Sequence, residues 1–195
     1  MGSPVVTENA NEGTDLVNVA IASLWSGTYT LAENIENATI ASSVKIMNDI
    51  NFTVAYNLVG NDLNNVLKGN SAKNTLDGAK GNDTMTGGLG NDSFNFSSAL
   101  SATNIDTISD FLSGTDKIAL RSSIFTKLLN DTNLLDNLVV GGIGAKAIDA
   151  NDYLIYNSFS KGLFYDADGS GAGTAVQFAT LNNVSTLNAN DFVVI

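Results

Sequence analysis

Every ninth position between residues 67 and 94 carries a large apolar side chain, and a glycine lies seven residues before each of them. An Asn or Asp follows each glycine by five residues. The three columns are Gly60, Gly69, Gly78 and Gly87; Asn65, Asn74, Asp83 and Asp92; and Leu67, Leu76, Met85 and Phe94. A fixed short period of this kind is typical of a solenoid, in which each repeat makes one turn and one short strand. The sequence therefore predicts a stack of β-coils over residues 60–96.

The segment before the repeats continues the apolar pattern less regularly. Leu58, Ile40 and Leu31 lie at multiples of nine from the first apolar repeat position, and Asp49 interrupts this series. Short strands separated by turn-rich stretches are predicted at residues 17–22, 28–31, 38–40 and 52–58. We expect residues 15–59 to form irregular coils that cap the N-terminal end of the solenoid, because an open end exposes the core and unpaired strand edges.

The segment after the repeats, residues 97–195, has a different pattern. Apolar and polar residues alternate over residues 105–120, and a hairpin is predicted from strands at 153–156 and 163–165, with a returning strand at 175–179. We expect a β-rich C-terminal cap that contains this hairpin. Residues 1–14 begin with Met-Gly-Ser, which is typical of a cloning remnant. They are expected to be a disordered linker to an upstream domain of a larger parent protein.

The composition narrows the chemistry. The 195 residues carry a net charge of −11, so nucleic acid and anionic membranes, which attract basic patches, are poor partners. The absence of His and Cys excludes Ser-His-Asp triads, Cys-His dyads, disulfides and zinc sites built from those residues, and we expect no enzyme activity. No apolar run approaches the length of a membrane span. The natural counter-charge is a hard cation such as Ca²⁺, which prefers carboxylate and carbonyl oxygens.

The last two repeats, GAKGNDTMT and GGLGNDSFN, match the pattern G-G-x-G-x-D-x-U-x, in which U is large and apolar. Residues 58–96 closely resemble the RTX, or hemolysin-type, calcium-binding repeat family. Residues 105–195 loosely resemble the C-terminal domains of serralysin-like proteases. The resemblance implies an all-β fold, a right-handed parallel β-roll in which two repeats complete one coil. Residues eighteen positions apart then lie on the same edge, about 4.8 Å from each other.

The same resemblance implies Ca²⁺ between turns that stack on one edge. Asn65 then faces Asp83 and Asn74 faces Asp92, with the aspartates supplying carboxylate ligands. In the family, backbone carbonyls and the glycine positions of the turns complete the site, and the corresponding residues here are Gly60, Asp62, Gly69, Ser71, Gly78, Lys80, Gly81, Gly87, Leu89 and Gly90. Glycine permits the positive φ that such turns need.

The first two repeats depart from the family pattern. Leu63 and Ala72 replace the second glycine, and asparagine replaces the aspartate. Asn61 and Asn70 stand at another glycine position, which is acceptable because Asn tolerates the left-handed backbone conformation. An amide oxygen is a neutral and weaker ligand, so we expect the first half of the roll to bind calcium weakly or to stack without metal. The alternative is a solenoid without metal, in which Gly and Asp only make turns.

Acidic residues outside the repeats supply further candidates. Asp106, Asp110 and Asp116 are expected either to bind another calcium ion at the end of the roll or to cap turns and short helices. Asp166 and Asp168 belong to a D-x-D-x-S-G stretch that copies the first half of an EF-hand loop, in which Gln177 replaces the bidentate glutamate. This loop is expected to be a hairpin turn first and at best a weak calcium site.

The chain ends with one acidic and four apolar residues, Asp191, Phe192, Val193, Val194 and Ile195. Beside RTX-like repeats, this ending resembles the uncleaved signal that type I secretion machinery reads. We expect a bacterial module that is secreted or held at the cell surface and folds when it meets calcium outside the cell. The alternative is a polysaccharide-binding or adhesin module on the same roll, for which Lys68, Lys73 and Lys80 offer a small basic patch.

Overall fold

The computed structural model describes residues 8–9, 13–20, 26–46, 50–128 and 134–195. Over these residues the chain is built from β-strands and short 3₁₀-helices, with no α-helix: η1 (Thr126–Leu128), η2 (Leu134–Asn137) and η3 (Ala189–Asp191). Within the described part of the chain, no helix has the length and apolar character needed to span a bilayer. The predicted linker 1–14 falls largely outside the described residues.

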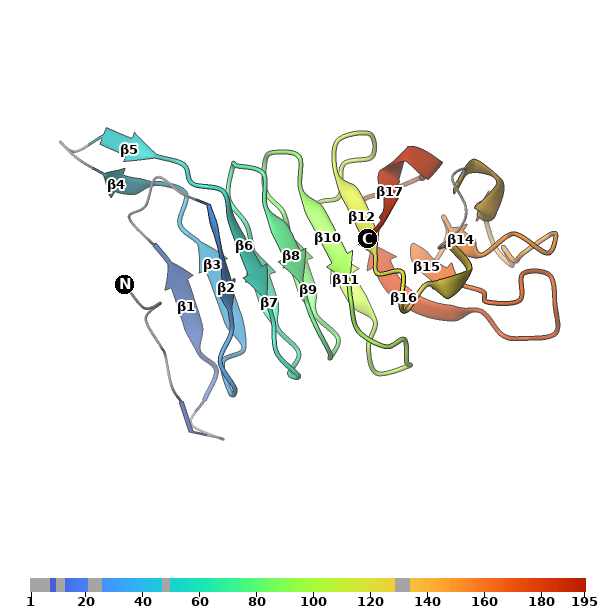
Figure 1. Cartoon of the computed structure of the whole chain (residues 1–195), viewed down its shortest axis with the longest axis horizontal. Coiled ribbons are helices and arrows are strands. Elements are labelled where there is room, and N and C mark those ends of the chain that lie inside the picture. Colours follow the sequence, from blue (N-terminus) through green and yellow to red (C-terminus); the bar gives the residue numbers. More distant parts are fainter. Residues whose placement is uncertain (1–7, 10–12, 21–25, 47–49, 129–133) are drawn as a thin grey trace.

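From β1 to β12 the strands alternate between two sheets, apart from β4 and β5, which form a separate hairpin, so the chain winds as a flattened coil (Figure 1). The nine-stranded sheet contains, in spatial order, β1 (Leu16–Val19), β3 (Asn37–Ile40), β7 (Val66–Lys68), β9 (Thr84–Thr86), β11 (Asp106–Ile108), β16 (Val176–Leu181), β15 (Gly162–Tyr165), β14 (Leu154–Asn157) and β13 (Leu138–Gly141). The six-stranded sheet contains β17 (Phe192–Val194), β12 (Lys117–Leu120), β10 (Ser93–Phe96), β8 (Thr75–Asp77), β6 (Tyr56–Val59) and β2 (Gly27–Thr30).

One large apolar residue of each repeat points into the space between the two sheets. Leu67 pairs with Met85 in one sheet, and Leu58, Leu76 and Phe94 stack in the other, always between parallel strands. All of these side chains are 0 % exposed. Because paired residues are eighteen positions apart, two nonapeptides make one coil. The predicted all-β fold with a parallel β-roll is therefore confirmed.

The N-terminal coils are longer than the repeat period predicts. Tyr29 pairs with Leu58 and Ala38 pairs with Leu67, which gives a step of 29 residues instead of eighteen. The prediction that Leu31 and Ile40 continue the series is therefore wrong, although both side chains are buried. The extra length is an antiparallel hairpin, β4 (Val44–Ile46) with β5 (Ile50–Phe52), inserted before β6. The strand predicted at 52–58 is thus divided between β5 and β6, and Asp49 lies outside the described residues.

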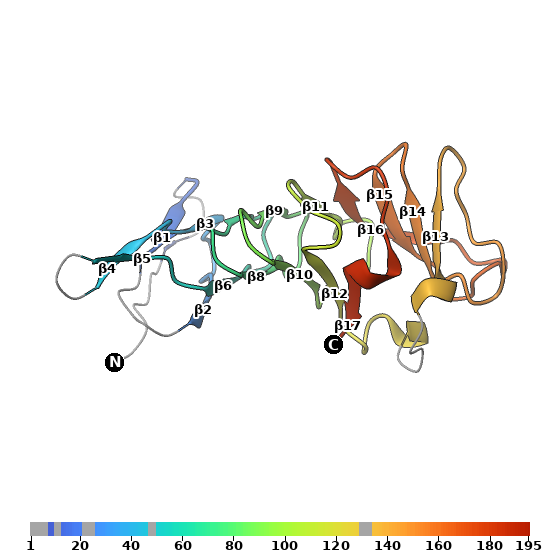
Figure 2. The same ribbon diagram turned by 90° about the horizontal axis from the view of Figure 1, so that it is seen from above.

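The C-terminal lobe extends the nine-stranded sheet beyond the end of the six-stranded one (Figure 2). The predicted hairpin is β14 with β15, and the predicted returning strand is β16, which joins the roll by pairing in parallel with β11. The sequence pattern did not indicate β13. Aromatic contacts connect lobe and roll, because the Phe178 ring lies 5.0 Å from those of Phe96 and Phe125.

Candidate metal sites

The turns between strands stack along two edges of the roll (Figure 1). The first edge consists of turns 60–65, 78–83 and 97–105, each of which leads from the six-stranded sheet to the nine-stranded sheet. The second edge consists of turns 69–74, 87–92 and 109–116, which lead back. Each edge therefore stacks two repeat turns with one turn that follows the repeats.

On the first edge, hydrogen bonds join three successive turns through acidic side chains. The Asn65 amide donates to Asp83 Oδ1 over 2.6 Å, and the Asp83 amide donates to Asp106 Oδ1 over 3.1 Å. All three residues are buried. The predicted facing pair Asn65 and Asp83 is thus together, and Asp106 extends the series by one turn.

The second edge repeats this arrangement. The Asn74 amide donates to Asp92 Oδ1 over 2.8 Å, and the Asp92 amide donates to Asp116 Oδ1 over 3.0 Å. Asn74, Asp92 and Asp116 are buried as well. We call the six residues the carboxylate ladder: Asn65, Asp83 and Asp106 on the first edge, and Asn74, Asp92 and Asp116 on the second.

The second oxygen of each repeat aspartate lacks a hydrogen-bond donor. Oδ2 of Asp83 and Oδ2 of Asp92 are buried without a partner among the described residues. A buried polar atom without a partner is costly, and a buried charge much more so. These two oxygens therefore mark positions where the fold needs either a proton or a cation.

In the asparagine repeats, the equivalent side-chain oxygen accepts a hydrogen bond from the backbone. The Asn61 amide donates to Asn65 Oδ1 over 2.9 Å, and the Asn70 amide donates to Asn74 Oδ1 over 2.8 Å. The turn of each asparagine repeat thereby closes on its own side chain. These turns are hydrogen-bonded without an ion.

In the glycine repeats the corresponding amide points elsewhere. The Ala79 amide donates to Asp77 Oδ1 over 3.0 Å, and the Gly88 amide donates to Asp110 Oδ2 over 2.8 Å. Ala79 has φ 69° and Gly88 has φ 98°. Gly81 and Gly90, two residues further along each turn, also have positive φ. Asn61 and Asn70 do not adopt positive φ, so the tolerance of Asn for the left-handed conformation is not used at these positions. The left-handed backbone turns the amide away and leaves the aspartate oxygen free for a ligand.

Close packing explains the glycine at the first position of these repeats. A Cβ atom on Gly78 would collide with the Asp83 carboxylate, and one on Gly87 would lie 2.5 Å from Asp92 Oδ2. The carbonyl oxygens of Gly78 and Gly87 in turn approach Gly60 and Gly69 on the neighbouring turn. Each edge therefore carries both carboxylate and carbonyl oxygens at its glycine positions, and these are the kinds of donor that Ca²⁺ prefers.

Burial shapes the electrostatics of the ladder. Desolvation raises the pKa of Asp83 to about 8, with a smaller contribution from the neighbouring Asp106 carboxylate. Desolvation also raises the pKa of Asp106 to about 6 and that of Asp92 to about 6, and it raises the pKa of Asp116. A bound cation would favour the ionised form of the same groups.

The remaining predicted ligands of the repeat turns face outward. Asp62, Ser71, Lys80 and Leu89 are exposed, so only their backbone carbonyls are available to a site between turns. The side chains of Lys80 and Asp62 form an exposed ion pair of 2.6 Å across neighbouring turns. Gly81 and Gly90 lie against the carbonyls of the neighbouring turn.

Two of the acidic residues after the repeats act as turn caps. Asp110 accepts from the amides of Gly87 and Gly88, at 2.9 and 2.8 Å. Asp116 accepts from Leu112 through Oδ2 at 2.8 Å, in addition to the ladder bond. The structure thus supports the capping alternative for both, while their carboxylates still lie at the second edge.

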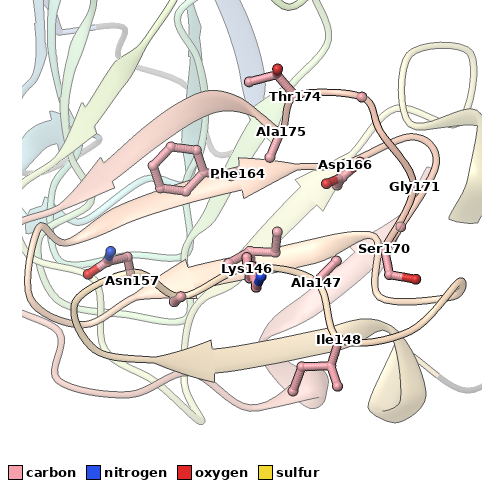
Figure 3. Close-up of a pocket in the computed structure, with 14 residues that line it drawn as sticks. Lys146, Ala147, Ile148, Asn157, Phe164, Asp166, Ser170, Gly171, Thr174 and Ala175 are labelled. Atoms are coloured by element: carbon pink, nitrogen blue, oxygen red, sulfur yellow. The ribbon is translucent and has the colours of Figure 1, made fainter.

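The loop with Asp166 and Asp168 lies in the C-terminal lobe, away from the ladder. Asp168 Oδ2 accepts from the Gly173 amide at 2.9 Å, and this hydrogen bond lowers the pKa of Asp168. Asp166 is buried, and desolvation raises its pKa. The loop borders an open cavity of about 600 Å³ (Figure 3). Its main local role is that of the turn between β15 and β16.

Sequence reasoning missed several residues that shape these edges. Asn61 Nδ2 donates to the carbonyls of Ala32 and Ile35 at 2.7 and 2.8 Å, and therefore joins the repeats to the N-terminal coil. The carboxylates of Glu8, Asp15 and Glu36 gather within 4.8 Å at the N-terminal end, where no sequence motif marks them. Asp77 supports the first edge, as described above.

Comparison with known proteins agrees with this geometry. The family model of the RTX calcium-binding nonapeptide repeat matches residues 59–94 in four copies. Repeats of this family bind Ca²⁺. No curated protein matches the chain. The matched segment covers less than one fifth of the chain and contains four of the six ladder residues. Residues 59–94 thus match four RTX calcium-binding nonapeptide repeats.

Proposed function

We propose that this chain is a calcium-dependent folding module of a larger secreted protein. One observation carries the proposal: the second oxygens of Asp83 and Asp92 are buried without a donor, next to the first glycines of their own turns. The same position is closed by hydrogen bonds in the asparagine repeats. A cation at each edge provides the partner for the aspartate oxygen that the backbone does not provide.

The ligands follow from the two edges. Asp83 and Asp92 provide carboxylates, with the backbone carbonyls of the glycine turns and their stacked neighbours around them. The proposed set for the first edge is Gly60, Asp62, Asn65, Gly78, Lys80, Gly81, Asp83 and Asp106. The proposed set for the second edge is Gly69, Ser71, Asn74, Gly87, Leu89, Gly90, Asp92, Asp110 and Asp116. Asp166 and Asp168 are proposed only as a weak additional site.

The mechanism is linkage between binding and folding. Calcium binds the stacked turns and hardly binds the unfolded chain, so each site stabilises the fold by about 2.7 kcal/mol when free calcium is a hundred times Kd. Without the ion, buried carboxylates such as Asp83 and Asp106 oppose one another, and a thin two-sheet core does not offset the loss of chain entropy. The chain then stays unfolded inside the cell, where free calcium is scarce, and folds outside.

The flanking segments serve this cycle. We assign residues 15–59 and 97–195 as caps of the 60–96 roll and residues 1–14 as a linker to an upstream domain. The terminal residues Asp191 to Ile195 act as the signal for type I secretion machinery. The repeat family supports an extracellular location, and the module itself carries no catalytic role.

A calcium titration followed by circular dichroism tests the proposal. The β-sheet signal should appear with calcium and be lost in excess chelator, while magnesium at equal concentration should not replace calcium, because it demands a smaller octahedral shell. The isosteric double variant D83N/D92N should fold with little dependence on calcium or not fold at all. A full β-sheet spectrum in chelator, with the same thermal midpoint as in calcium, would refute the proposal.

A polysaccharide-binding function is a second candidate because of the cavity in the C-terminal lobe. Phe164 and Ile155 form an apolar part of its lining, and Lys146, Asn157 and Thr174 add polar groups (Figure 3). The basic patch predicted on the roll offers less support, because Lys80 is paired with Asp62. Calorimetry with neutral and acidic oligosaccharides in calcium, with the Phe164→Ala variant as control, distinguishes this candidate from a folding module alone.

A further inference from the structure

Asp191 is buried deeply for a carboxylate so close to the end of the chain. It is 0 % exposed, and its oxygens accept three hydrogen bonds. Ser113 Oγ and the Asn188 amide donate to Oδ2 at 2.7 and 2.8 Å, and the Gly114 amide donates to Oδ1 at 2.7 Å. Two of these three donors belong to turn 109–116, which is remote in sequence and is the last turn of the second edge.

The same turn holds the last part of the carboxylate ladder. Its residue Asp116 accepts from the Asp92 amide, and its residue Asp110 accepts from the amides of Gly87 and Gly88. Ser113 and Gly114 lie between these two carboxylates, and Gly114 has φ 84°. The turn is therefore hydrogen-bonded to the fourth repeat on one side and to Asp191 on the other side.

Other C-terminal contacts reinforce these hydrogen bonds. Asn188 Nδ2 donates to Ser113 Oγ at 3.2 Å, and Asn183 Nδ2 donates to the Phe111 carbonyl at 3.0 Å. Strand β17 pairs in parallel with β12, directly after the turn, so that η3 and β17 lie beside it (Figure 1). A charged acceptor makes the Asp191 bonds the strongest of this group.

The first edge has no such hydrogen bonds to the chain end among the described residues. Its last turn, 97–105, is held by local bonds such as that from Asn104 Nδ2 to the Ala99 carbonyl, and by the Ile105 amide, which donates to Asn82 Oδ1. Asp106 then pairs with Ala179 of β16, which precedes the terminal segment. The two edges thus differ in their dependence on the chain end.

We propose that Asp191 is a positioning residue for the calcium site of the second edge, so that docking of the chain end and calcium binding at Asp92 are one coupled event. The inference rests on the proposed calcium function of the edges. Asp191 does not bind the ion directly. It holds Ser113 and Gly114 in place and thereby positions Asp110 and Asp116. When the chain end is released, turn 109–116 loses these contacts and the calcium site of the second edge is no longer held together.

The test compares the two edges within the full chain. In a D83N background only the second edge retains its repeat aspartate, and in a D92N background only the first edge does. Calcium affinity is measured by calorimetry in each background with and without D191N. We expect D191N to weaken calcium binding about tenfold or more in the D83N background, which corresponds to the loss of one hydrogen bond to a charged group. In the D92N background we expect a change of less than about twofold.

Controls separate this effect from a general loss of stability. Asp149 is exposed and lies outside both edges, so D149N removes the same charge and should leave both affinities unchanged. S113A removes a single donor to Asp191 and should act in the same direction as D191N, with a smaller effect that is not additive with it. If D191N abolishes folding, S113A provides the comparison between the edges.

The outcomes distinguish the inference from the proposed function. A parent chain that binds no calcium refutes the proposed function itself. A parent chain that binds calcium at both edges, with affinities that D191N and S113A leave unchanged or lower equally at both, overturns only the role of Asp191.

Discussion

At the scale of single residues, the contrast between asparagine and glycine repeats defines the chemistry. Both kinds of repeat occupy equivalent turns, yet Asn65 Oδ1 has a donor and Asp83 Oδ2 has none. The difference comes from the backbone at the second repeat position, where Asn61 donates inward and Ala79 does not. A left-handed turn is thus the local condition for an ion site, and a closed turn is the condition for stacking without one.

Ala79 gives a direct measure of that condition, because it is a residue with a Cβ at φ 69°. The left-handed conformation costs an L-residue about 1–2 kcal/mol, and the extra freedom of glycine in the unfolded chain costs about 0.5–1 kcal/mol, so A79G should stabilise the calcium-bound fold by about 0.5–1 kcal/mol. Ala72, at the fourth position of its repeat, has no positive φ, so the same substitution A72G should destabilise by about 0.4–1 kcal/mol. Urea unfolding in calcium measures both, and a stabilising A72G with a destabilising A79G would contradict the assignment of the turns.

The raised pKa values of the ladder predict how the metal-free chain responds to pH. Asp83 has a pKa of about 8 in the fold against 3.8 as an ordinary aspartate, and Asp92 and Asp106 have values of about 6. Because folding raises these values, the folded state holds more protons than the unfolded state. Its metal-free stability is therefore fully present below about pH 4 and declines as the pH rises through 6 and then 8.

In excess chelator, lowering the pH from 8 to 5 should thus increase the β-sheet circular dichroism signal. The same change should also weaken calcium binding to the folded roll, since protons compete with calcium for the carboxylates. The D83N variant serves as control, because it should lose the part of the response between pH 6 and 8. A chelator-treated chain that is better folded at pH 8 than at pH 5 would be incompatible with the buried, unpaired ladder.

At the scale of elements, the repeat period predicted some strands well and others not at all. Strands β7 to β10 follow from the sequence because each nonapeptide has one inward residue, such as Leu76 or Met85, at a fixed place after its glycine. The upstream register failed because Tyr29 and Leu31 are both apolar, both buried and two residues apart on one face. A nine-residue count fits Leu31, whereas the strand pairing uses Tyr29.

The sequence likewise predicted some residues of the candidate sites and not others. A spacing of eighteen predicts that Asn65 meets Asp83 and that Asn74 meets Asp92, and the structure brings both pairs together. Asp106 follows Asp83 by 23 residues, so periodicity alone does not place it on the ladder. The role of Asp191 was out of reach for sequence reasoning, because it depends on β17 packing against a turn that is 77 residues away in the chain. Long-range strand order, which no local pattern encodes, decides such contacts.

At the scale of the whole molecule, the net charge of −11 raises the question whether calcium acts by screening or by occupying sites. Monovalent salt at about 0.1 M screens exposed charges beyond about 10 Å but acts much less on buried groups. The ladder residues Asp83 and Asp92 are each 1 % exposed. If these sites control folding, raising KCl in chelator should not compact the chain, whereas calcium at matched ionic strength should.

Small-angle scattering measures this difference as the radius of gyration. For a chain of this length, an unfolded ensemble has a radius of roughly 47 Å and a compact globule one of roughly 16 Å. The roll with its lobe is elongated (Figure 2), so the calcium-bound value should lie above the globular one and far below the unfolded one. In chelator the value should stay close to the unfolded one at both about 0.1 and about 0.5 M KCl. Compaction by KCl alone would mean that general repulsion among the acidic residues, and not the unpaired oxygens at the two edges, keeps the chain open.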